Sequence, residues 1–195
     1  GLGEKSGIDL SGEKEGILPD PAYKKEKLKD EWRLGDTYNV SIGQGDLAVT
    51  PIELLNYVSA IANGGKLLKP RVVLQATDEN GNVVFKNSAV ILRDLTFLEK
   101  QFQEVRAGME DAVLKPYGTA FVLSGLPFRA AAKTGTAQIK KNTETNAFFV
   151  GFAPAENPKI AILILIENSL EGSGNTLPVA KDVLMWYYQN RIKNG

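Results

Sequence analysis

Cysteine and histidine are both absent from the sequence. Without cysteine the chain has no thiol nucleophile and no disulfide, and without both residue types it has no Cys/His zinc site. A Ser-His-Asp triad is excluded as well, because the imidazole base is missing. We expect no metal and no cofactor. The lack of cysteine also fits an exported bacterial protein.

An excess of charge of either sign and a long apolar run are missing too. Lys and Arg together number 23, as do Asp and Glu, so the formal net charge is zero. This balance argues against nucleic acid as a partner. No run of 18 apolar residues is present, so the sequence predicts no membrane-spanning helix. The opening GLGEKSGIDLSGE has neither the basic nor the apolar part of a signal peptide, and it suggests a piece cut from a longer protein.

The 195 residues are enough for one domain with a sizeable core, and 43% of them are hydrophobic. Residues 1–36 are rich in Gly, Lys, Glu and Pro, which predicts surface loops and short turns. The run KKEKLKDEW at 24–32 mixes charge signs and predicts a solvated face.

Residues 50–63 predict a helix. Thr50 is a good N-cap, Pro51 suits the first helical position, and Glu53 completes a capping box. Gly64 and Gly65 then end the helix, because glycine accepts the left-handed conformation.

The remaining elements follow in a clear order. Residues 70–86 predict a hairpin around Asn80-Gly81, and residues 96–114 predict a helix. FFVGFA and KIAILILIE read as two strands, the second buried on both faces. A terminal helix is expected over 176–192, with the following residues on its packing side: Val179, Val183, Leu184, Trp186 and Tyr187. The order predicts an α+β fold, an antiparallel sheet covered by helices.

The segment AAAKTGTAQ at 130–138 carries the most distinctive chemistry. In a strand, Thr134 and Thr136 lie on one face and Lys133 on the other, while Gly135 allows close approach by a ligand or another backbone. Hydroxyls, an ammonium and free N–H groups suit a carboxylate, and an N–H also suits a developing oxyanion. The alternative is a polar edge strand with exposed Lys and Thr side chains.

The wider sequence resembles class B penicillin-binding proteins along essentially its whole length. AAAKTGTAQ followed by NAFFVGFAPAENPKIAILILIEN is similar to their Lys-Thr-Gly region. Three more stretches agree in order: GLGEKSGIDLSGEKEGILP, GDTYNVSIGQGDLAVTPIELLNYVSAIANGG and YGTA. The SIGQG form after GDTYN resembles the elongation-type enzymes. Residues 1–195 would then be the C-terminal portion of a transpeptidase domain with the penicillin-binding protein/serine β-lactamase fold.

The resemblance implies a D,D-transpeptidase, anchored in the membrane and working on its extracytoplasmic face. It would cross-link peptidoglycan stem peptides through a serine acyl-enzyme and be inhibited by β-lactams. Implied partners are a glycan-polymerising membrane protein and scaffold proteins of the elongation machinery.

The resemblance also assigns roles to the motif. Lys133 would hold the active-site polar network, Thr134 and Thr136 hydroxyls would bind the substrate carboxylate, and the Thr136 N–H would form half of the oxyanion hole. Gly135 belongs to the same substrate-binding segment. Ala132 departs from a glycine common before the motif lysine, which could change local packing.

The family's Ser-x-x-Lys and Ser-x-Asn segments precede the GLGEKSGIDL region, so we expect both to be absent from this chain. Two stretches match by letter only. Ser11-Gly12-Glu13-Lys14 lies among loop-forming residues, and Ser173-Gly174-Asn175 falls after the KTG, where it suits a turn or a helix cap. Gln44 between two glycines could line the cleft but favours a turn. The cluster Trp186, Tyr187 and Tyr188 favours core packing.

Three other functions remain open. The chain could belong to a non-catalytic β-lactam sensor or binding domain, because KTG alone does not discriminate. It could come from a β-lactamase, although the IGQG-to-ANGG segment resembles the large synthases. It could also be a degenerate relative whose KTG no longer works.

Overall fold

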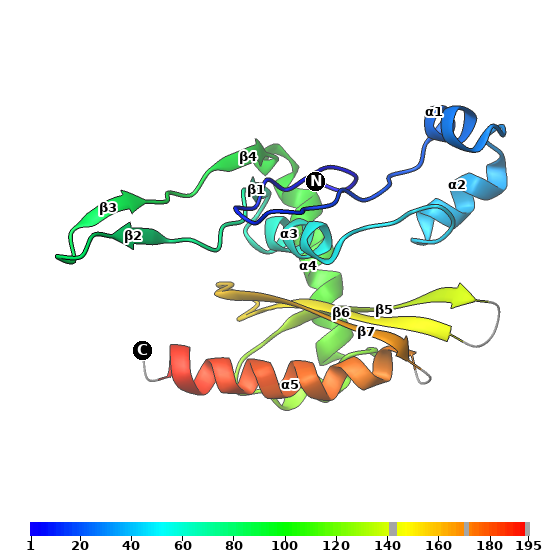
Figure 1. Cartoon of the computed structure of the whole chain (residues 1–195). Coiled ribbons are helices and arrows are strands. Elements are labelled where there is room, and N and C mark those ends of the chain that lie inside the picture. Colours follow the sequence, from blue (N-terminus) through cyan, green and yellow to red (C-terminus); the bar gives the residue numbers. More distant parts are fainter. Residues whose placement is uncertain (141–143, 170–171, 194–195) are drawn as a thin grey trace. The chain divides into compact units, whose positions relative to one another are not determined.

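The computed structural model describes residues 1–140, 144–169 and 172–193 and divides the chain into two compact units. Unit 1 comprises residues 1–57 and 68–92, and unit 2 comprises residues 58–67 and 93–195. Figure 1 labels the helices and strands of both units. Among the described residues, no helix combines the length and the apolar character needed to cross a bilayer.

The first 41 residues of unit 1 contain more helix than the composition predicted. The helices are α1 (Pro21–Tyr23), the π-helical η1 (Lys24–Leu28) and α2 (Leu34–Ser41). Asp20 caps α1 by accepting a hydrogen bond of 2.6 Å from the backbone N–H of Tyr23, and Pro21 occupies the first helical position. The prediction of loops was therefore wrong for these helical residues. The Asp20-Pro21 pair that starts α1 is a very short pattern, and it does not stand out in a stretch that is polar throughout.

The helix predicted over 50–63 is α3 (Pro51–Ala62). The capping box is present: Thr50 N–H donates to Glu53 Oε2 at 2.7 Å, and Glu53 N–H donates to Thr50 Oγ1 at 3.3 Å. Gly64 and Gly65 follow with φ of +81° and +112°, which glycine adopts without a side-chain penalty. The predicted helix, its capping box and its end at the two glycines are all confirmed.

The predicted hairpin is confirmed as β2 (Gln75–Thr77) paired with β3 (Val83–Lys86). At its tip, Asp78 Oδ1 accepts from the N–H groups of Asn80 and Asn82 at 3.0 and 2.8 Å. All residues of the two strands are exposed. A second two-stranded sheet, β1 (Lys66–Leu68) with β4 (Ile91–Asp94), was not predicted because both strands are very short.

Unit 2 is built on an antiparallel sheet of order β5-β6-β7. The strands are β5 (Ala131–Lys140), β6 (Glu144–Ala153) and β7 (Ile160–Ser169). Helix α5 (Thr176–Tyr187) packs against β6 and β7, and α4 (Glu99–Leu114) against β5 (Figure 1). The 3-10 helices are η2 (Thr96–Leu98), η3 (Phe121–Gly125) and η4 (Gly172–Asn175), and the π-helical η5 (Tyr188–Ile192) extends α5. An antiparallel sheet with helices against it agrees with the predicted α+β class.

The core of unit 2 joins the sheet to α4, η3 and α5. Its buried members are Val113, Ala120, Leu123, Leu126, Ala130, Ala132, Phe149, Ala153, Ala180 and Leu184. Ala132 is the member of this core that belongs to β5, and Ala130 directly precedes the strand.

Three packing predictions were wrong in detail. On α5 the buried stripe is Thr176, Ala180 and Leu184, spaced by four residues, so Val179, Val183 and Trp186 are exposed. Strand β7 is half-buried over residues 160–166 rather than buried on both faces; it packs against α5 and has β6 as its neighbour in the sheet. The expected aromatic core fails at Trp186, which is 55% exposed, whereas Tyr188 packs on Phe128 with ring centroids 5.3 Å apart.

Candidate active-site strand

The KTGT segment lies in β5, and within the described residues this strand is paired only with β6. The register places Lys133, Thr134, Gly135 and Thr136 opposite Val150, Phe149, Phe148 and Ala147. An antiparallel edge strand leaves alternate N–H and C=O groups outside the sheet. The structure therefore places all four predicted site residues on one strand at a sheet edge.

On both faces of β5, burial gives way to exposure along the strand, and on one face the buried Ala131 precedes the exposed Lys133. Ala132 and Thr134 are buried, with exposed fractions of 0% and 6%, whereas Thr136 further along the same face is exposed. Lys133 is exposed, and its ammonium donates a hydrogen bond to the carbonyl oxygen of Thr134. The two threonines share a face as predicted, but only Thr136 presents its side chain to the exterior.

Thr119 is a site residue that the sequence reasoning missed. The hydroxyl of Thr134 donates to Thr119 Oγ1 at 2.9 Å. Thr119 belongs to the YGTA stretch, to which the family resemblance assigns no side-chain role. Ala120 N–H donates to Ala112 O at 2.9 Å, so the end of α4 anchors this turn.

Gly118 explains why the turn comes so close to α4. A Cβ at this position would lie 2.2 Å from the carbonyl oxygen of Ala112 and 2.9 Å from that of Asp111. No side chain fits at such distances, so only glycine permits the approach. The glycine and the threonine of YGTA thus have separate structural roles.

Gly135 presents the opposite situation. A Cβ built there meets a single neighbouring atom within 4 Å, Phe148 Cβ at 3.6 Å, which is an ordinary contact. Among the described residues, packing therefore gives no reason for glycine at this position. The open space beside Gly135 lies over the face of β5 that Gly135 shares with Lys133, where a ligand can come close to the strand.

The residues that match family motifs by letter only behave as loops and turns. Ser11 is exposed in a turn, and Lys14 follows outside any helix, so the pair lacks the helical geometry of Ser-x-x-Lys. Ser173 lies in η4 directly before α5. Gln44 lies between Gly43 and Gly45, whose φ values are +74° and +75°, and its N–H donates to Asn39 O at 2.8 Å. The turn interpretation of Gln44 is confirmed.

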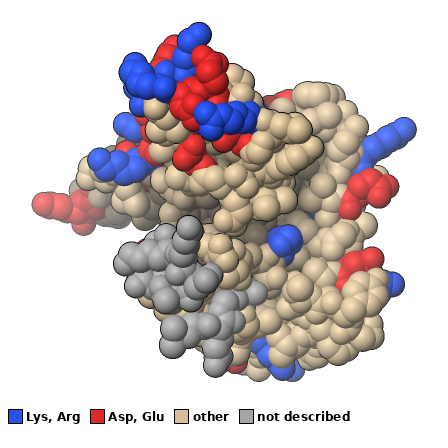
Figure 2. All heavy atoms as spheres, turned by 90° about the vertical axis from the view of Figure 1, so that its right-hand side faces the viewer, with Lys and Arg blue, Asp and Glu red and all other residues tan. Residues whose placement is uncertain are grey.

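The charged stretch 24–32 contains one buried side chain, so the prediction of a solvated face was wrong at Lys24. Lys24 Nζ lies 2.6 Å from Asp36 Oδ2 and 3.4 Å from Asp30 Oδ2. The hydrogen bond from Lys24 holds the pKa of Asp36 below its usual value, and the same bond raises the pKa of Lys24. Figure 2 shows basic and acidic side chains intermingled at the top of the view, over the α1–α2 segment.

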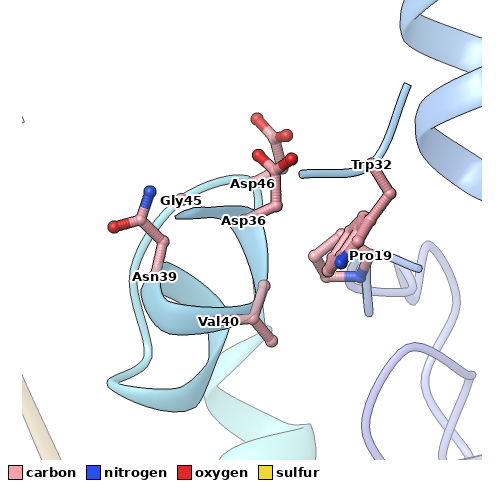
Figure 3. A pocket seen from close by; sticks show the side chains of 7 residues that line it. All are labelled: Pro19, Trp32, Asp36, Asn39, Val40, Gly45 and Asp46. Carbon is pink, nitrogen blue, oxygen red and sulfur yellow. The ribbon is translucent and has the colours of Figure 1, made fainter. Parts of the chain in front are cut away.

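A small polar pocket adjoins this ion pair. It is lined by Pro19, Trp32, Asp36, Asn39, Val40, Gly45 and Asp46, whose arrangement is shown in Figure 3. Its volume of about 20 Å³ has room for one water molecule, so it is too small for a peptide or a drug. Asp36 on its wall is already engaged by Lys24.

Comparison with known proteins gives one consistent family. Residues 1–185 match the family described as penicillin binding protein transpeptidase domain. The peptidoglycan D,D-transpeptidase MrdA of Acinetobacter baumannii is 33% identical over 208 residues, covering 100% of this chain and 30% of that protein.

Solved structures agree with the sequence match. The complex of penicillin-binding protein PBP2 and MreC from Helicobacter pylori has a TM-score of 0.82 at 34% identity, covering 98% of this chain and 35% of that one. A ceftriaxone acyl-enzyme complex of penicillin-binding protein A from M. tuberculosis has a TM-score of 0.64 at 26% identity, covering 75% and 34%. The predicted fold is confirmed, and the chain spans about a third of the length of these relatives.

Proposed function

The chain belongs to the penicillin-binding protein transpeptidase family, and on that premise we propose that it is the carboxylate-binding part of a peptidoglycan D,D-transpeptidase. In the proposed reaction, a serine hydroxyl attacks the carbonyl carbon between two terminal D-alanines and loses its proton to a base. The last D-alanine leaves as a protonated amine. The amine of a second stem peptide then attacks the ester, forms the cross-link and frees the serine.

The exposed edge of β5 is the observation that carries this proposal. Thr136 presents its hydroxyl outside the core, and Lys133 on the other face brings a positive charge to the same segment. We assign the substrate carboxylate to this segment, Lys133 through Thr136, because ammonium and hydroxyl donors both suit an anion. The Thr136 N–H is assigned to the oxyanion that develops during acylation, where a fixed donor stabilises the transition state.

The open space beside Gly135 supports a ligand running along the strand. A peptide that pairs with the edge of β5 places its own side chains over the two faces of the sheet, and Gly135 leaves the face that it shares with Lys133 open for one of them. A β-lactam has the same requirement, since it carries a carboxylate next to its reactive amide.

The nucleophilic serine is proposed to lie outside these 195 residues. Ser11 occupies an exposed turn outside any helix, and Ser173 lies after the KTG strand with a threonine, not a lysine, three residues later, so neither matches a helical Ser-x-x-Lys. The chain then contributes one wall of an active site whose Ser-x-x-Lys and Ser-x-Asn segments come from the rest of the protein.

Partners and location follow from the relatives. One solved structure is a complex of PBP2 with MreC, and we propose that a scaffold protein of this kind binds the full-length protein. A glycan-polymerising membrane protein is the second proposed partner. The site of action is the extracytoplasmic face of the cytoplasmic membrane, where stem peptides are cross-linked.

The test is intact-protein mass spectrometry after exposure to a fluorescent penicillin, on this chain and on the full-length protein. We expect an adduct on the full-length protein only. An adduct on a serine of the isolated chain would overturn the external nucleophile, and no adduct on either would overturn the enzymatic function. Turnover of a D-Ala-D-Ala peptide with an amine acceptor separates a transpeptidase from a β-lactam sensor, which is labelled without turnover.

A further inference from the structure

Two Asn-Gly pairs lie in the described part of the chain, and their asparagine side chains have different surroundings. Asn63-Gly64 directly follows α3, and Asn80-Gly81 belongs to the tip of the hairpin β2–β3 (Figure 1). Both asparagines are exposed, and a Cβ built at either glycine would meet no atom within 4 Å. The backbone nitrogen after each asparagine is therefore not shielded by a side chain. A third pair, at 194–195, lies outside the described residues.

The side-chain amide of Asn63 is held at both ends. Its Nδ2 donates to the carbonyl oxygen of Lys66 at 2.7 Å, and its Oδ1 accepts from the N–H of the same residue at 2.8 Å. A reaction between the Asn63 side chain and the backbone nitrogen of Gly64 requires the side chain to turn toward that nitrogen. Both hydrogen bonds to Lys66 must break before this can happen.

The side chain of Asn80 is not held in this way. Among the residues that the structure describes, its amide has no hydrogen-bond partner, although its backbone N–H donates to Asp78 Oδ1 at 3.0 Å. The N–H of Gly81 donates to Asp78 O at 3.0 Å. Gly64 has the equivalent bond, to Ile61 O at 3.3 Å, so this feature does not separate the two pairs. The hairpin tip is exposed, and its local opening uncovers no core.

We propose that Asn80 is a site of spontaneous deamidation and that Asn63 is protected from the same reaction. The backbone nitrogen of Gly81 attacks the side-chain carbon Cγ of Asn80, and the bond from Cγ to Nδ2 breaks. The proton of the Gly81 N–H passes through water to the departing nitrogen, which leaves as ammonia. Water then opens the five-membered imide at either carbonyl group, which leaves an aspartyl or a β-aspartyl residue at position 80. One water is consumed and one ammonia is released. This inference is independent of the proposed function.

The reaction changes both the charge and the backbone of the hairpin tip. The new carboxylate follows Asp78 and Glu79, so three consecutive residues carry a negative charge. The β-aspartyl product also adds one carbon atom to the backbone between residues 80 and 81. Asp78 Oδ1 accepts from N–H groups on both sides of that link, those of Asn80 and Asn82, and a longer link displaces one donor from the other. Amide hydrogen exchange over residues 75–86 should therefore become faster.

The experiment incubates the full-length protein at mildly alkaline pH and follows each asparagine by tryptic peptide mapping. Asn80 lies in the peptide 72–86 and Asn63 in the peptide 34–66, and fragmentation assigns the mass gain to one asparagine in each. A second sample is incubated in urea, where the protein is unfolded. Asn80→Gln is the matched control, because its longer side chain would have to close a six-membered ring. Thermal unfolding shows that the variant remains folded.

In the native protein, Asn80 should deamidate at least about tenfold faster than Asn63, because two hydrogen bonds hold the Asn63 amide. In urea the two rates should converge, since neither side chain keeps a folded neighbour. Asn80→Gln should abolish the mass gain in the peptide 72–86.

Three results would overturn the proposal. Equal rates at Asn63 and Asn80 in the native protein would show that the bonds to Lys66 give no protection. A mass gain on Asn82 with none on Asn80 would place the reaction at the wrong residue. An Asn63 that stays slow in urea would assign its protection to the neighbouring sequence rather than to the fold.

Discussion

At the scale of single residues, two glycines near the strand KTGT have opposite surroundings. Gly118 is enclosed by the carbonyl groups of Asp111 and Ala112, whereas Gly135 has one ordinary neighbour. The first glycine is required by the fold. The second is required, on the proposed function, by the ligand.

Gly135→Ala is therefore expected to leave the thermal midpoint within about 2 °C of wild type, since the new methyl group meets only Phe148 Cβ at 3.6 Å. Acylation of the full-length protein by penicillin should fall at least about tenfold, because the methyl group occupies space that the ligand needs. Gly118→Ala is the matched control: its methyl group would clash with Ala112 O, which should cost about 1–3 kcal/mol of the free energy of unfolding. If Gly135→Ala is acylated as fast as the wild type, the ligand does not lie against β5 at Gly135.

At this scale the sequence predicts features that depend on neighbouring residues, and it misses contacts between residues far apart in the chain. The alternation of Thr134 and Thr136 to one face is a local property of a strand, and it was predicted correctly. The partner of Thr134 lies 15 residues away in a turn, and no local pattern predicts such a contact. Lys24 was missed for the same reason, because Asp36 reaches it from another helix.

At the scale of elements, the capping residue at the beginning of α3 also binds a segment far away in the sequence. Glu53 is fully buried, and besides capping its own helix it accepts a hydrogen bond of 2.8 Å from the N–H of Gly16. Next to it, Ile17 and Ala48 exchange two backbone hydrogen bonds of 2.6 and 3.0 Å. The Thr-x-x-Glu pattern predicted the helix cap. It did not predict that the Glu53 carboxylate also binds the N–H of Gly16 in a distant segment.

Glu53→Ala leaves the N–H groups of Gly16 and Thr50 without their acceptor. We expect a loss of about 2–4 kcal/mol in the free energy of unfolding, from the missing cap and a buried unsatisfied donor. Urea unfolding of the chain, followed by circular dichroism, measures it. Glu99→Ala, in the first turn of α4, removes an exposed carboxylate that accepts a hydrogen bond from Gln103 at 3.2 Å, and should cost less than about 1 kcal/mol. Equal losses in the two variants would contradict the role of Glu53.

At the scale of the whole molecule, the carboxyl groups with a lowered pKa are unequally divided among the residues that the structure describes. Unit 1 contains Asp9, Glu13, Asp30, Asp36 and Asp78, and unit 2 contains Asp94 and Glu156. The leading causes are hydrogen bonds, for example from Val72 N–H to Asp9 and from Lys24 to Asp36. A carboxyl group whose pKa is lowered by folding stabilises the fold above its unfolded pKa, about 4, and loses this contribution as the pH falls through the folded value.

Acid should therefore unfold unit 1 before unit 2. The chain has two tryptophans, Trp32 in unit 1 and Trp186 in unit 2, so each unit carries its own fluorescent reporter. In Trp186→Phe, the emission of Trp32 should change at a higher pH than the emission of Trp186 does in Trp32→Phe. Coincident acid transitions in the two variants would show that protonation acts on both units equally.

The hairpin β2–β3 offers a practical opening for cell biology. Its strand residues are all exposed, and its tip is held by Asp78 through bonds made within the turn itself. Exposed polar loop tips tolerate insertions, because lengthening them uncovers no core. A short epitope or dye-binding peptide placed after Asn80 would let the protein be followed in living bacteria while both ends of the chain stay as they are.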